Sequence, residues 1–256
     1  MAKMFHVFLL FFRKFGARSF IQHINRAVRK ISSVTHYCQH VIEWGAPPTP
    51  ENYDHFLDQY WQWGKYGNPL PWERGIFSLL AMEKDAKVLE LCCGDGFNAY
   101  HFYAIRAKSI QALDFDVDVI HLAKKNFKNA KIEYLYGDIR YDLLEEYFDH
   151  IIWDGAIEHF SEAEMDGIMK SIKKRLSKNG ILSGYTIAES KTGVLSHSEH
   201  KYEFKSKEDL FRFLSSYFKK VKIFETIYPN RHNLYFYASD NRPLPFDDAW
   251  DKQLSR

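Results

Sequence analysis

The sequence predicts an α/β fold: a doubly wound, mostly parallel seven-stranded sheet with an antiparallel last strand, preceded by an N-terminal helical extension. Two observations lead to this prediction. From residue 87 onward, short apolar runs alternate with segments whose apolar residues recur every three or four positions, which is typical of parallel strands joined by helices. The last two runs are joined by residues 228–232 alone, and so short a connection permits only an antiparallel hairpin.

The apolar runs expected to form strands cover residues 88–91, 110–113, 132–136, 150–153, 181–185, 221–227 and 233–238. Helical spacing predicts helices that begin near residues 97, 117, 161 and 206. The third of them starts at a capping-box pattern, Ser161 with Glu164, and is expected to end at Asn179-Gly180.

The first 42 residues differ from the rest in charge, because they contain seven Lys and Arg but no Asp or Glu. The remaining 28 basic and 33 acidic residues make the rest of the chain mildly acidic. We expect residues 1–45 to form a basic amphipathic helical extension. Three interpretations stay open: a helix packed on the body, a helix lying on an anionic membrane surface, or a transit peptide.

The rest of the chain divides at changes in composition. Prolines at 47, 48 and 50 predict a stiff linker. Residues 51–82 are rich in aromatic side chains and are expected to form a helical lid that packs on the sheet edge, covers a bound ligand, or does both. A domain over 83–240 and a tail over 241–256 complete the expected organisation.

Composition excludes several classes of protein. Cys38, Cys92 and Cys93 form neither a disulfide framework nor a metal-ligand spacing, so a reducing, cytoplasmic setting and no metal are expected. No apolar run approaches the ~20 residues of a membrane span, and membrane contact would be peripheral, through the extension. Nucleic acid is disfavoured as a partner, because the acidic body has no basic stripe.

Acidic residues end four of the predicted parallel strands: Glu90, Asp114, Asp138 and Asp154. Ligands of open α/β sheets bind at that carboxyl edge, where the strand order reverses. A glycine turn, Glu90-Leu91-Cys92-Cys93-Gly94-Asp95-Gly96, leads from the first of these strands into a helix and would present free backbone amides there.

Together these segments resemble the motifs of class I S-adenosylmethionine-dependent methyltransferases of the small-molecule branch, over roughly residues 72–240. The 90–96 turn is similar to their first motif, and 148–160 to their fourth. The resemblance implies S-adenosylmethionine as cofactor, with a binding set of Glu90, Cys92, Gly94, Gly96, Asp114, Phe115, Asp138, Ile139, Asp154 and Arg74. Cys92 departs from the pattern, since the family has glycine there.

The chemistry of the cofactor fits these positions. Asp114 can accept hydrogen bonds from both ribose hydroxyls, and Asp138 can accept one from the adenine amine while Ile139 packs on the ring. Glu90 can hold the turn or pair with the methionine ammonium. Arg74 is either a partner of the methionine carboxylate or a surface charge.

Methyl transfer also needs alignment and, for most nucleophiles, a base. His159 follows the fourth strand, and His197 and His200 lie in a polar segment, 186–205, that could fold over the site. Each is equally well explained as a structural or surface imidazole.

The sequence thus predicts an enzyme that methylates a small-molecule acceptor, at a hydroxyl of a lipid-linked, quinone-like or sugar-like compound. Two alternatives stay open. One is an NAD(P)-binding oxidoreductase, because Gly94-x-Gly96-x-x-Ala99 also fits a dinucleotide fingerprint. The other is a non-catalytic scaffold that binds a partner or membrane through residues 1–42.

Overall fold

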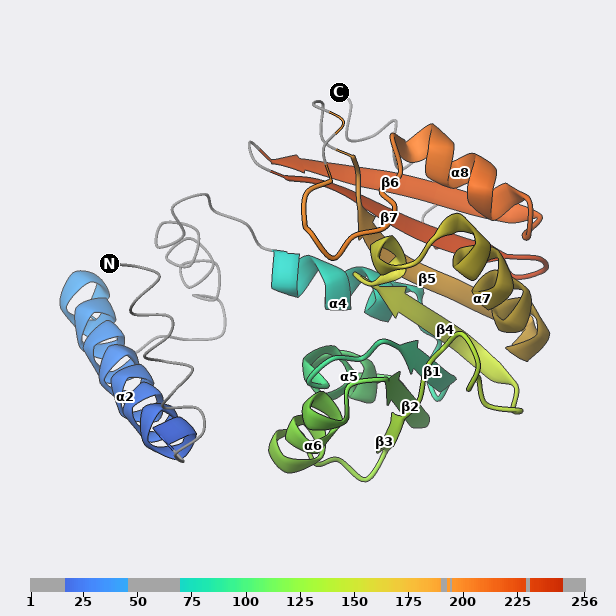
Figure 1. Ribbon diagram of the computed structural model, residues 1–256. Helices are drawn as coiled ribbons and strands as arrows, with labels where there is room; N and C mark the ends of the chain where they lie inside the picture. The colour runs from blue at the N-terminus through green and yellow to red at the C-terminus, as the bar shows by residue number, and fades with distance from the viewer. Residues whose placement is uncertain (1–16, 46–69, 190–192, 194, 229–230, 246–256) are drawn as a thin grey trace. The chain divides into compact units, whose positions relative to one another are not determined.

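The computed structural model describes residues 17–45, 70–189, 193, 195–228 and 231–245. The chain divides into two units, residues 1–67 and 68–256, and each is described by itself. In the first unit the described part is one helix, α2 (Ala17–Trp44), drawn in blue in Figure 1. It falls within the predicted extension. Of the predicted aromatic lid, residues 51–69 lie outside the described residues.

The second unit is built on a seven-stranded sheet in the order β3-β2-β1-β4-β5-β7-β6 (Figure 1). The first five strands in the chain run parallel, and β7 is antiparallel to both β5 and β6, as predicted. The order reverses between β1 and β4, which creates the switch point at which such sheets bind ligands. The strands are β1 (Lys87–Leu91), β2 (Ser109–Asp114), β3 (Ile132–Tyr136), β4 (Phe148–Asp154), β5 (Leu176–Ile187), β6 (Lys220–Tyr228) and β7 (Arg231–Ser239).

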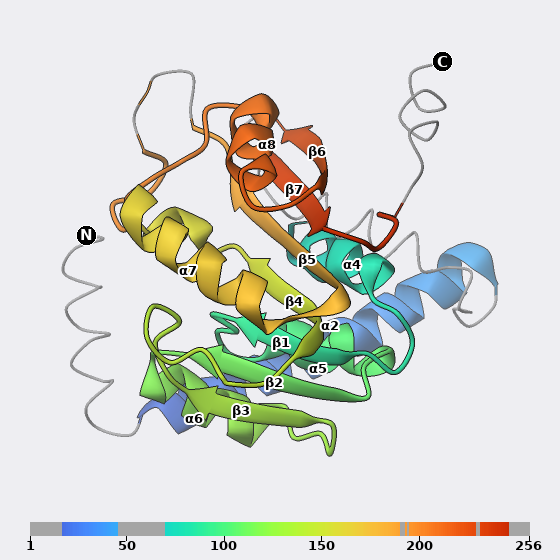
Figure 2. The ribbon, with the colours of Figure 1, turned by 90° about the vertical axis from the view of Figure 1, so that its right-hand side faces the viewer.

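Helices cover both faces of the sheet (Figure 2). One face carries α4 (Leu70–Ala81), which packs on β5 and β7, together with α5 (Phe97–His101) and α6 (Val117–Asn126), which lie over β1, β2 and β3. The other face carries α7 (Glu162–Arg175) and α8 (Lys207–Ser215), packed on β4, β5, β6 and β7. Two short 3-10 turns, η2 (Tyr103–Ile105) and η3 (Ile157–His159), complete the unit. The two hydrophobic layers fix the sheet and so hold its carboxyl edge rigid.

Helix α7 begins as the sequence predicts. Ser161 Oγ accepts a hydrogen bond from the Glu164 amide at 3.4 Å, and Glu164 Oε2 accepts one from the Ser161 amide at 2.8 Å. The predicted end of this helix is wrong, because α7 stops at Arg175 and Leu176 already belongs to β5. Leu176 pairs with Phe148 of β4, so sheet pairing overrides the helical pattern there.

In α2, apolar side chains recur at helical spacing on one face and are exposed: Phe20, Ile24, Val28, Ile31, Val34 and Ile42. By the same spacing Arg26 lies on the opposite face, and Lys30 lies at the border of the apolar stripe. Even so, none of the helices in the described ranges is both long enough and apolar enough to cross a membrane.

Gly184 of β5 lies where the sheet leaves no room for a side chain. A Cβ there would lie 2.3 Å from the carbonyl oxygen of Trp153 and 2.3 Å from the ring of Phe236. The backbone oxygen cannot move aside without breaking the β4–β5 pairing. This glycine therefore allows the close approach of strands that carry the site.

We expect Gly184→Ala to lower the free energy of unfolding by ~3 kcal/mol, the upper end of the usual cost of overpacking. Gly167→Ala is the matched control, because nothing lies within 4 Å of its Cβ position in α7. That change should raise stability by ~0.5–1 kcal/mol, the ordinary gain for alanine in a helix. Urea denaturation of both variants measures the difference, and equal effects would contradict the packing described here.

Candidate active site

Three acidic side chains meet at the switch point, each at the end of a different strand. Glu90 of β1, Asp114 of β2 and Asp154 of β4 are 2%, 7% and 8% exposed. Carboxylates are rarely this buried unless they are paired or serve a ligand. The structure therefore brings these three predicted residues together at one edge of the sheet.

The turn from β1 to α5 is left-handed at several positions. Cys92, Gly94 and Gly96 have φ values of 55°, 56° and 81°. Gly96 is also sterically required, since a Cβ there would lie 2.5 Å from the ring of Tyr134. Cys92 bears a strain of about 1–2 kcal/mol for a side chain in this region, which explains why the methyltransferase motif has glycine at its place.

Asp114 is oriented by the turn that it faces. Its Oδ2 accepts a hydrogen bond from the Gly94 amide at 2.9 Å, and its Oδ1 accepts one from the Asp116 amide at 2.9 Å. A carboxylate oxygen has two lone pairs, so both oxygens can accept a further bond. Asp114 is thus a fixed, two-oxygen acceptor.

Glu90 and Asp154 differ in their hydrogen bonds. Asp154 Oδ2 accepts a hydrogen bond from Tyr103 at 2.7 Å, and Ser78 Oγ lies 3.5 Å from both of its oxygens. Glu90 Oε2 is buried and has no hydrogen-bond partner among the residues described. Burial, and then the charges of Asp154, Asp114 and Asp95, raise the pKa of Glu90 well above its ordinary value. A cation placed here would offset both the desolvation of the Glu90 carboxylate and its repulsion by the neighbouring acids.

Two adjoining cavities lie over this edge. One of about 390 Å³ is lined by the turn together with Glu90 and Asp154. The other, of about 420 Å³, is lined by Phe115, Asp138, Ile139 and His159 among others. Cys92 borders both, so its side chain stands at their junction. Burial raises the pKa of the Cys92 thiol far above its usual range, so this side chain is an uncharged wall rather than a nucleophile. A larger open depression beside α6 and β3 contains none of the predicted site residues.

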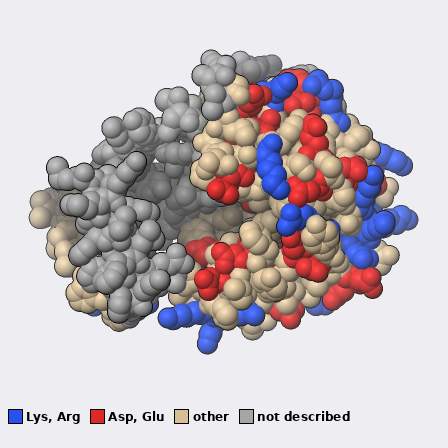
Figure 3. Space-filling view, viewed as in Figure 1, with Lys and Arg blue, Asp and Glu red and all other residues tan. Residues whose placement is uncertain are grey.

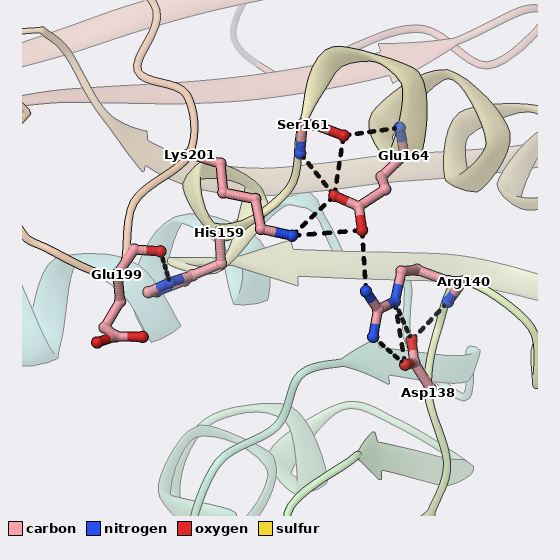
Figure 4. A network of polar contacts seen from close by, with 7 residues as sticks. All are labelled: Asp138, Arg140, His159, Ser161, Glu164, Glu199 and Lys201. Atoms are coloured by element: carbon pink, nitrogen blue, oxygen red, sulfur yellow. Dashed lines mark hydrogen bonds and ion pairs between the residues drawn. The ribbon is translucent and has the colours of Figure 1, made fainter.

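Asp138 lines the second cavity, but its carboxylate is engaged by Arg140, with Nε 2.9 Å from Oδ1 (Figure 4). Arg140 Nη1 also donates to Glu164 at 2.9 Å, and Lys201 Nζ donates to the same carboxylate at 3.0 Å. The Arg140 bonds lower the pKa of Asp138, and the Ser161 amide with the two cations holds the pKa of Glu164 at about 2. The adenine contact expected of Asp138 would have to share this carboxylate with Arg140.

The polar segment after β5 folds onto the cavity rim. The amides of Lys201 and Tyr202 donate to the Glu158 carbonyl at 2.8 and 3.2 Å, and the Glu199 carbonyl lies 3.2 Å from His159 Nδ1 (Figure 4). The ring of His200 lies 4.9 Å from that of His159 and 5.5 Å from that of His197. The three candidate histidines are therefore neighbours, although only His159 is among the residues that line the cavity.

Two features stand apart from the sequence prediction. The Arg74 side chain lies outside what the structure describes, so its assignment stays a prediction.

Sequence analysis missed Glu158, whose carboxylate lies with His159 and His200 in a group of potential metal ligands within 4.8 Å of one another. The adjacency of Glu158 and His159 after a strand end was the available signal. Phe115 is 66% exposed and Ile139 is 3% exposed.

Comparison with known proteins agrees with this architecture. Residues 88–180 match a family model described as a methyltransferase domain. TehB from Haemophilus influenzae is similar with a TM-score of 0.52, at 16% identity over 65% of this chain and 61% of that one. This segment is therefore similar to a methyltransferase domain, and the chain has the class I methyltransferase fold. The match in residues 88–180 contains β1 and β4, the two strands at the switch point.

Further solved structures resemble this methyltransferase domain. The DhpI–SAH complex has a TM-score of 0.54 at 14% identity, over 81% of this chain and 95% of that one. N-methyltransferase NodS from Bradyrhizobium japonicum WM9 has a TM-score of 0.54 at 16% identity, over 68% of this chain and 98% of that one. At such identities the likeness shows the fold. No curated protein matches the sequence.

The cofactor of this class is S-adenosylmethionine, and the residues present fit it. The reactant carries a sulfonium and an ammonium, and the buried oxygen of Glu90 without a partner lies at a cavity wall that would receive positive charge. Asp114 still has lone pairs for a diol. The strained turn at Cys92 and Gly94 leaves the backbone open toward the cleft.

The raised pKa of Glu90 makes cofactor binding depend on pH. A bound cation favours the carboxylate, so binding releases protons below the pKa of the free protein, and affinity falls as the pH drops. Glu90→Gln should weaken S-adenosylmethionine binding by about 10–100-fold at high pH and flatten this dependence, since a charged hydrogen-bond partner is lost. Calorimetry in buffers of different ionisation enthalpy measures both effects.

The same substitution should stabilise the protein without cofactor. Because the folded-state pKa of Glu90 is raised, its contribution to stability is full below about pH 4.3 and is lost as the pH rises through the folded-state value. At neutral pH Glu90→Gln removes the destabilisation that comes from ionising this buried carboxylate. Glu133→Gln, at an exposed position of β3, is the control and should change neither quantity. Unchanged proton release in Glu90→Gln would rule out this carboxylate as the group responsible.

Proposed function

We propose that the domain transfers the methyl group of S-adenosylmethionine to a hydroxyl of a small molecule. The observation that supports this choice is the imidazole of His159 at the wall of the second cavity, with His200 beside it. A neutral amine attacks with a free lone pair, whereas a hydroxyl must lose its proton during transfer. Bases at the cavity therefore favour an oxygen nucleophile.

In the proposed arrangement the cofactor occupies both cavities and passes Cys92. Asp114 accepts hydrogen bonds from the ribose hydroxyls, and Glu90 with Asp154 faces the methionine ammonium. Ile139 and Phe115 flank the adenine, and Asp138 accepts from its amine while it remains bonded to Arg140. Gly94 and Gly96 leave room for the backbone to approach the cofactor. Arg74 remains a candidate partner for the methionine carboxylate.

The acceptor then lies on the side of the methyl group where the polar segment 195–205 meets η3. His159 is the proposed base because it borders the cavity directly, and His197 and His200 are further candidates from the same cluster. The acceptor class that we favour is lipid-linked, quinone-like or sugar-like. N-methyltransferases such as NodS share the fold, so an amine acceptor is the competing substrate class.

Calorimetry with S-adenosylmethionine and with NAD tests the cofactor, and the proposal expects binding of the first alone. Asp114→Asn should weaken binding of S-adenosylmethionine by about 10–100-fold, because one charged acceptor of the ribose is lost. Asp118→Asn, at an exposed position near the start of α6, is the matched control and should bind normally. Binding of NAD instead would support the oxidoreductase alternative.

A matched panel of hydroxylated and aminated acceptors, followed by release of S-adenosylhomocysteine, tests the nucleophile. Turnover of amines alone would refute O-methylation, and cofactor binding without turnover of any acceptor would favour the scaffold. Nucleic acid stays disfavoured, since acidic and basic side chains are interspersed on the face of the second unit that Figure 3 shows.

We further propose that α2 places the enzyme on an anionic membrane surface, which would suit a lipid-linked acceptor. Support comes from its apolar stripe, where Phe20, Ile31 and Ile42 are 67%, 63% and 82% exposed. Residues 1–42 contain seven Lys and Arg and no Asp or Glu, so their net positive charge complements anionic lipids.

Liposome flotation tests this proposal with the full chain. Ile31→Asp should abolish flotation with anionic vesicles, because it places a charge in the apolar stripe. Asn25→Asp adds the same charge on the exposed polar side and should reduce flotation only slightly. Equal flotation of the two variants, or none by the unaltered protein, would contradict a membrane role for α2.

A further inference from the structure

The polar segment after β5 assembles a group of side chains that sequence analysis did not connect. Glu158 and His159 lie in η3, just beyond β4, and His200 lies far along the chain in the folded-back segment. One potential ligand atom from each lies within 4.8 Å of the other two. Glu158 is 4% exposed, whereas the two histidines are partly accessible.

The hydrogen bonds of the two imidazoles define which nitrogen is free. His159 Nδ1 lies 3.2 Å from the Glu199 carbonyl oxygen, and His200 Nδ1 lies 2.5 Å from Glu203 Oε1. A carbonyl and a carboxylate only accept, so Nδ1 carries the proton in both rings. The lone pair of each neutral ring is therefore on Nε2, the state in which imidazole binds a metal ion.

The groups behind these rings are those that support metal ligands. Metal-binding histidines commonly donate their second nitrogen to a carboxylate or a backbone carbonyl, and here one of each is present. Glu203 is itself held, since its Oε1 accepts from the Ser196 amide at 2.8 Å. Its Oε2 is buried without a partner in the described part of the chain, so added positive charge on His200 would stabilise it.

Glu158 completes the set. Its Oε2 accepts a hydrogen bond from Thr186 Oγ1 at 3.0 Å, and no Lys or Arg of the described ranges pairs with it. A buried carboxylate is costly without a cation. The same hydroxyl bond would orient it as a ligand, in the way that ligating carboxylates are usually hydrogen-bonded.

We propose that Glu158, His159 and His200 bind a divalent transition-metal ion, for which Zn²⁺ serves as the probe. Two imidazoles and one carboxylate are a donor set that Zn²⁺ accepts, at ~2.0–2.2 Å from each ligand and with a position left open. The 4.8 Å limit is the separation between ligand atoms, so the three side chains would have to move closer together around an ion.

The proposed metal site adjoins the cavity in which the cofactor is proposed to bind. His159 also lines the cavity that contains Asp138 and Ile139, so the open position would lie beside the proposed cofactor. An acceptor hydroxyl bound there would ionise more readily and become a better nucleophile, so the metal would replace His159 as the activating group, because a ligating imidazole has no lone pair left to act as a base. This use rests on the proposed methyl transfer, whereas metal binding itself does not.

Metal binding is measured on the full chain, stripped of metal and free of cofactor and acceptor. Competition of Zn²⁺ with a chromophoric chelator should give one site per chain. His200→Ala and Glu158→Gln should each weaken Zn²⁺ binding by at least tenfold. Glu203→Gln, which changes the group that holds His200 Nδ1, should weaken it by about 10–100-fold. Co²⁺ should give the visible absorption of a site with nitrogen and oxygen ligands.

Two controls keep the test decisive. His121→Ala removes an exposed imidazole of α6 and should leave metal affinity unchanged. Calorimetry of S-adenosylmethionine with His200→Ala should give the affinity of the unaltered protein, which separates loss of metal from loss of the fold or of the cofactor site. Absence of stoichiometric Zn²⁺ binding, equal affinity in His200→Ala, or a thiolate absorption band from Co²⁺ that assigns the ion to the cysteines would overturn the proposal.

Discussion

The hydrogen bond from the Gly94 amide to Asp114 is the constraint on which the site depends. It joins the turn after β1 to the end of β2, two strands that pair in parallel register from Lys87 with Ser109 onward. The turn can donate this bond only because its backbone adopts left-handed conformations at Cys92 and Gly94. The same conformations expose the backbone toward the cleft. One contact thus fixes both the shape of the turn and the direction of the carboxylate.

Burial of like charges is the electrostatic cost of this arrangement. Glu90, Asp114 and Asp154 converge with little solvent, and Glu90 responds with a raised pKa. Tyr103 and Ser78 offset part of the cost at Asp154, but no described group does so for Glu90 Oε2. Such a site is less stable empty than filled by a cation. This is the usual conflict between stability and function at a preformed site.

The polar segment after β5 gives the cleft its second wall. It is held by main-chain bonds to Glu158 and by the ion-pair network of Arg140, Glu164 and Lys201 (Figure 4). These contacts join the ends of β3 and β4, the start of α7 and the segment itself. These contacts therefore fix the positions of the imidazoles of His159 and His200. Surface ion pairs contribute little singly, but this network shares one carboxylate between two cations.

The sequence alone determined the fold class, the glycine turn and the acids Glu90, Asp114 and Asp154 at the carboxyl edge, because strand, turn and helix cap are encoded within a few neighbouring residues. It also determined the capping box at Ser161. Tertiary structure decided the end of α7, where pairing of Leu176 with Phe148 replaced the last helical turn. It decided that Arg140 engages Asp138, and that His200 reaches Glu158 and His159. The strand pairing and the meeting of His200 with η3 depend on contacts between segments far apart in the chain, which no local pattern encodes. Arg140 engages a residue only two positions away, but its second bond goes to Glu164 of α7.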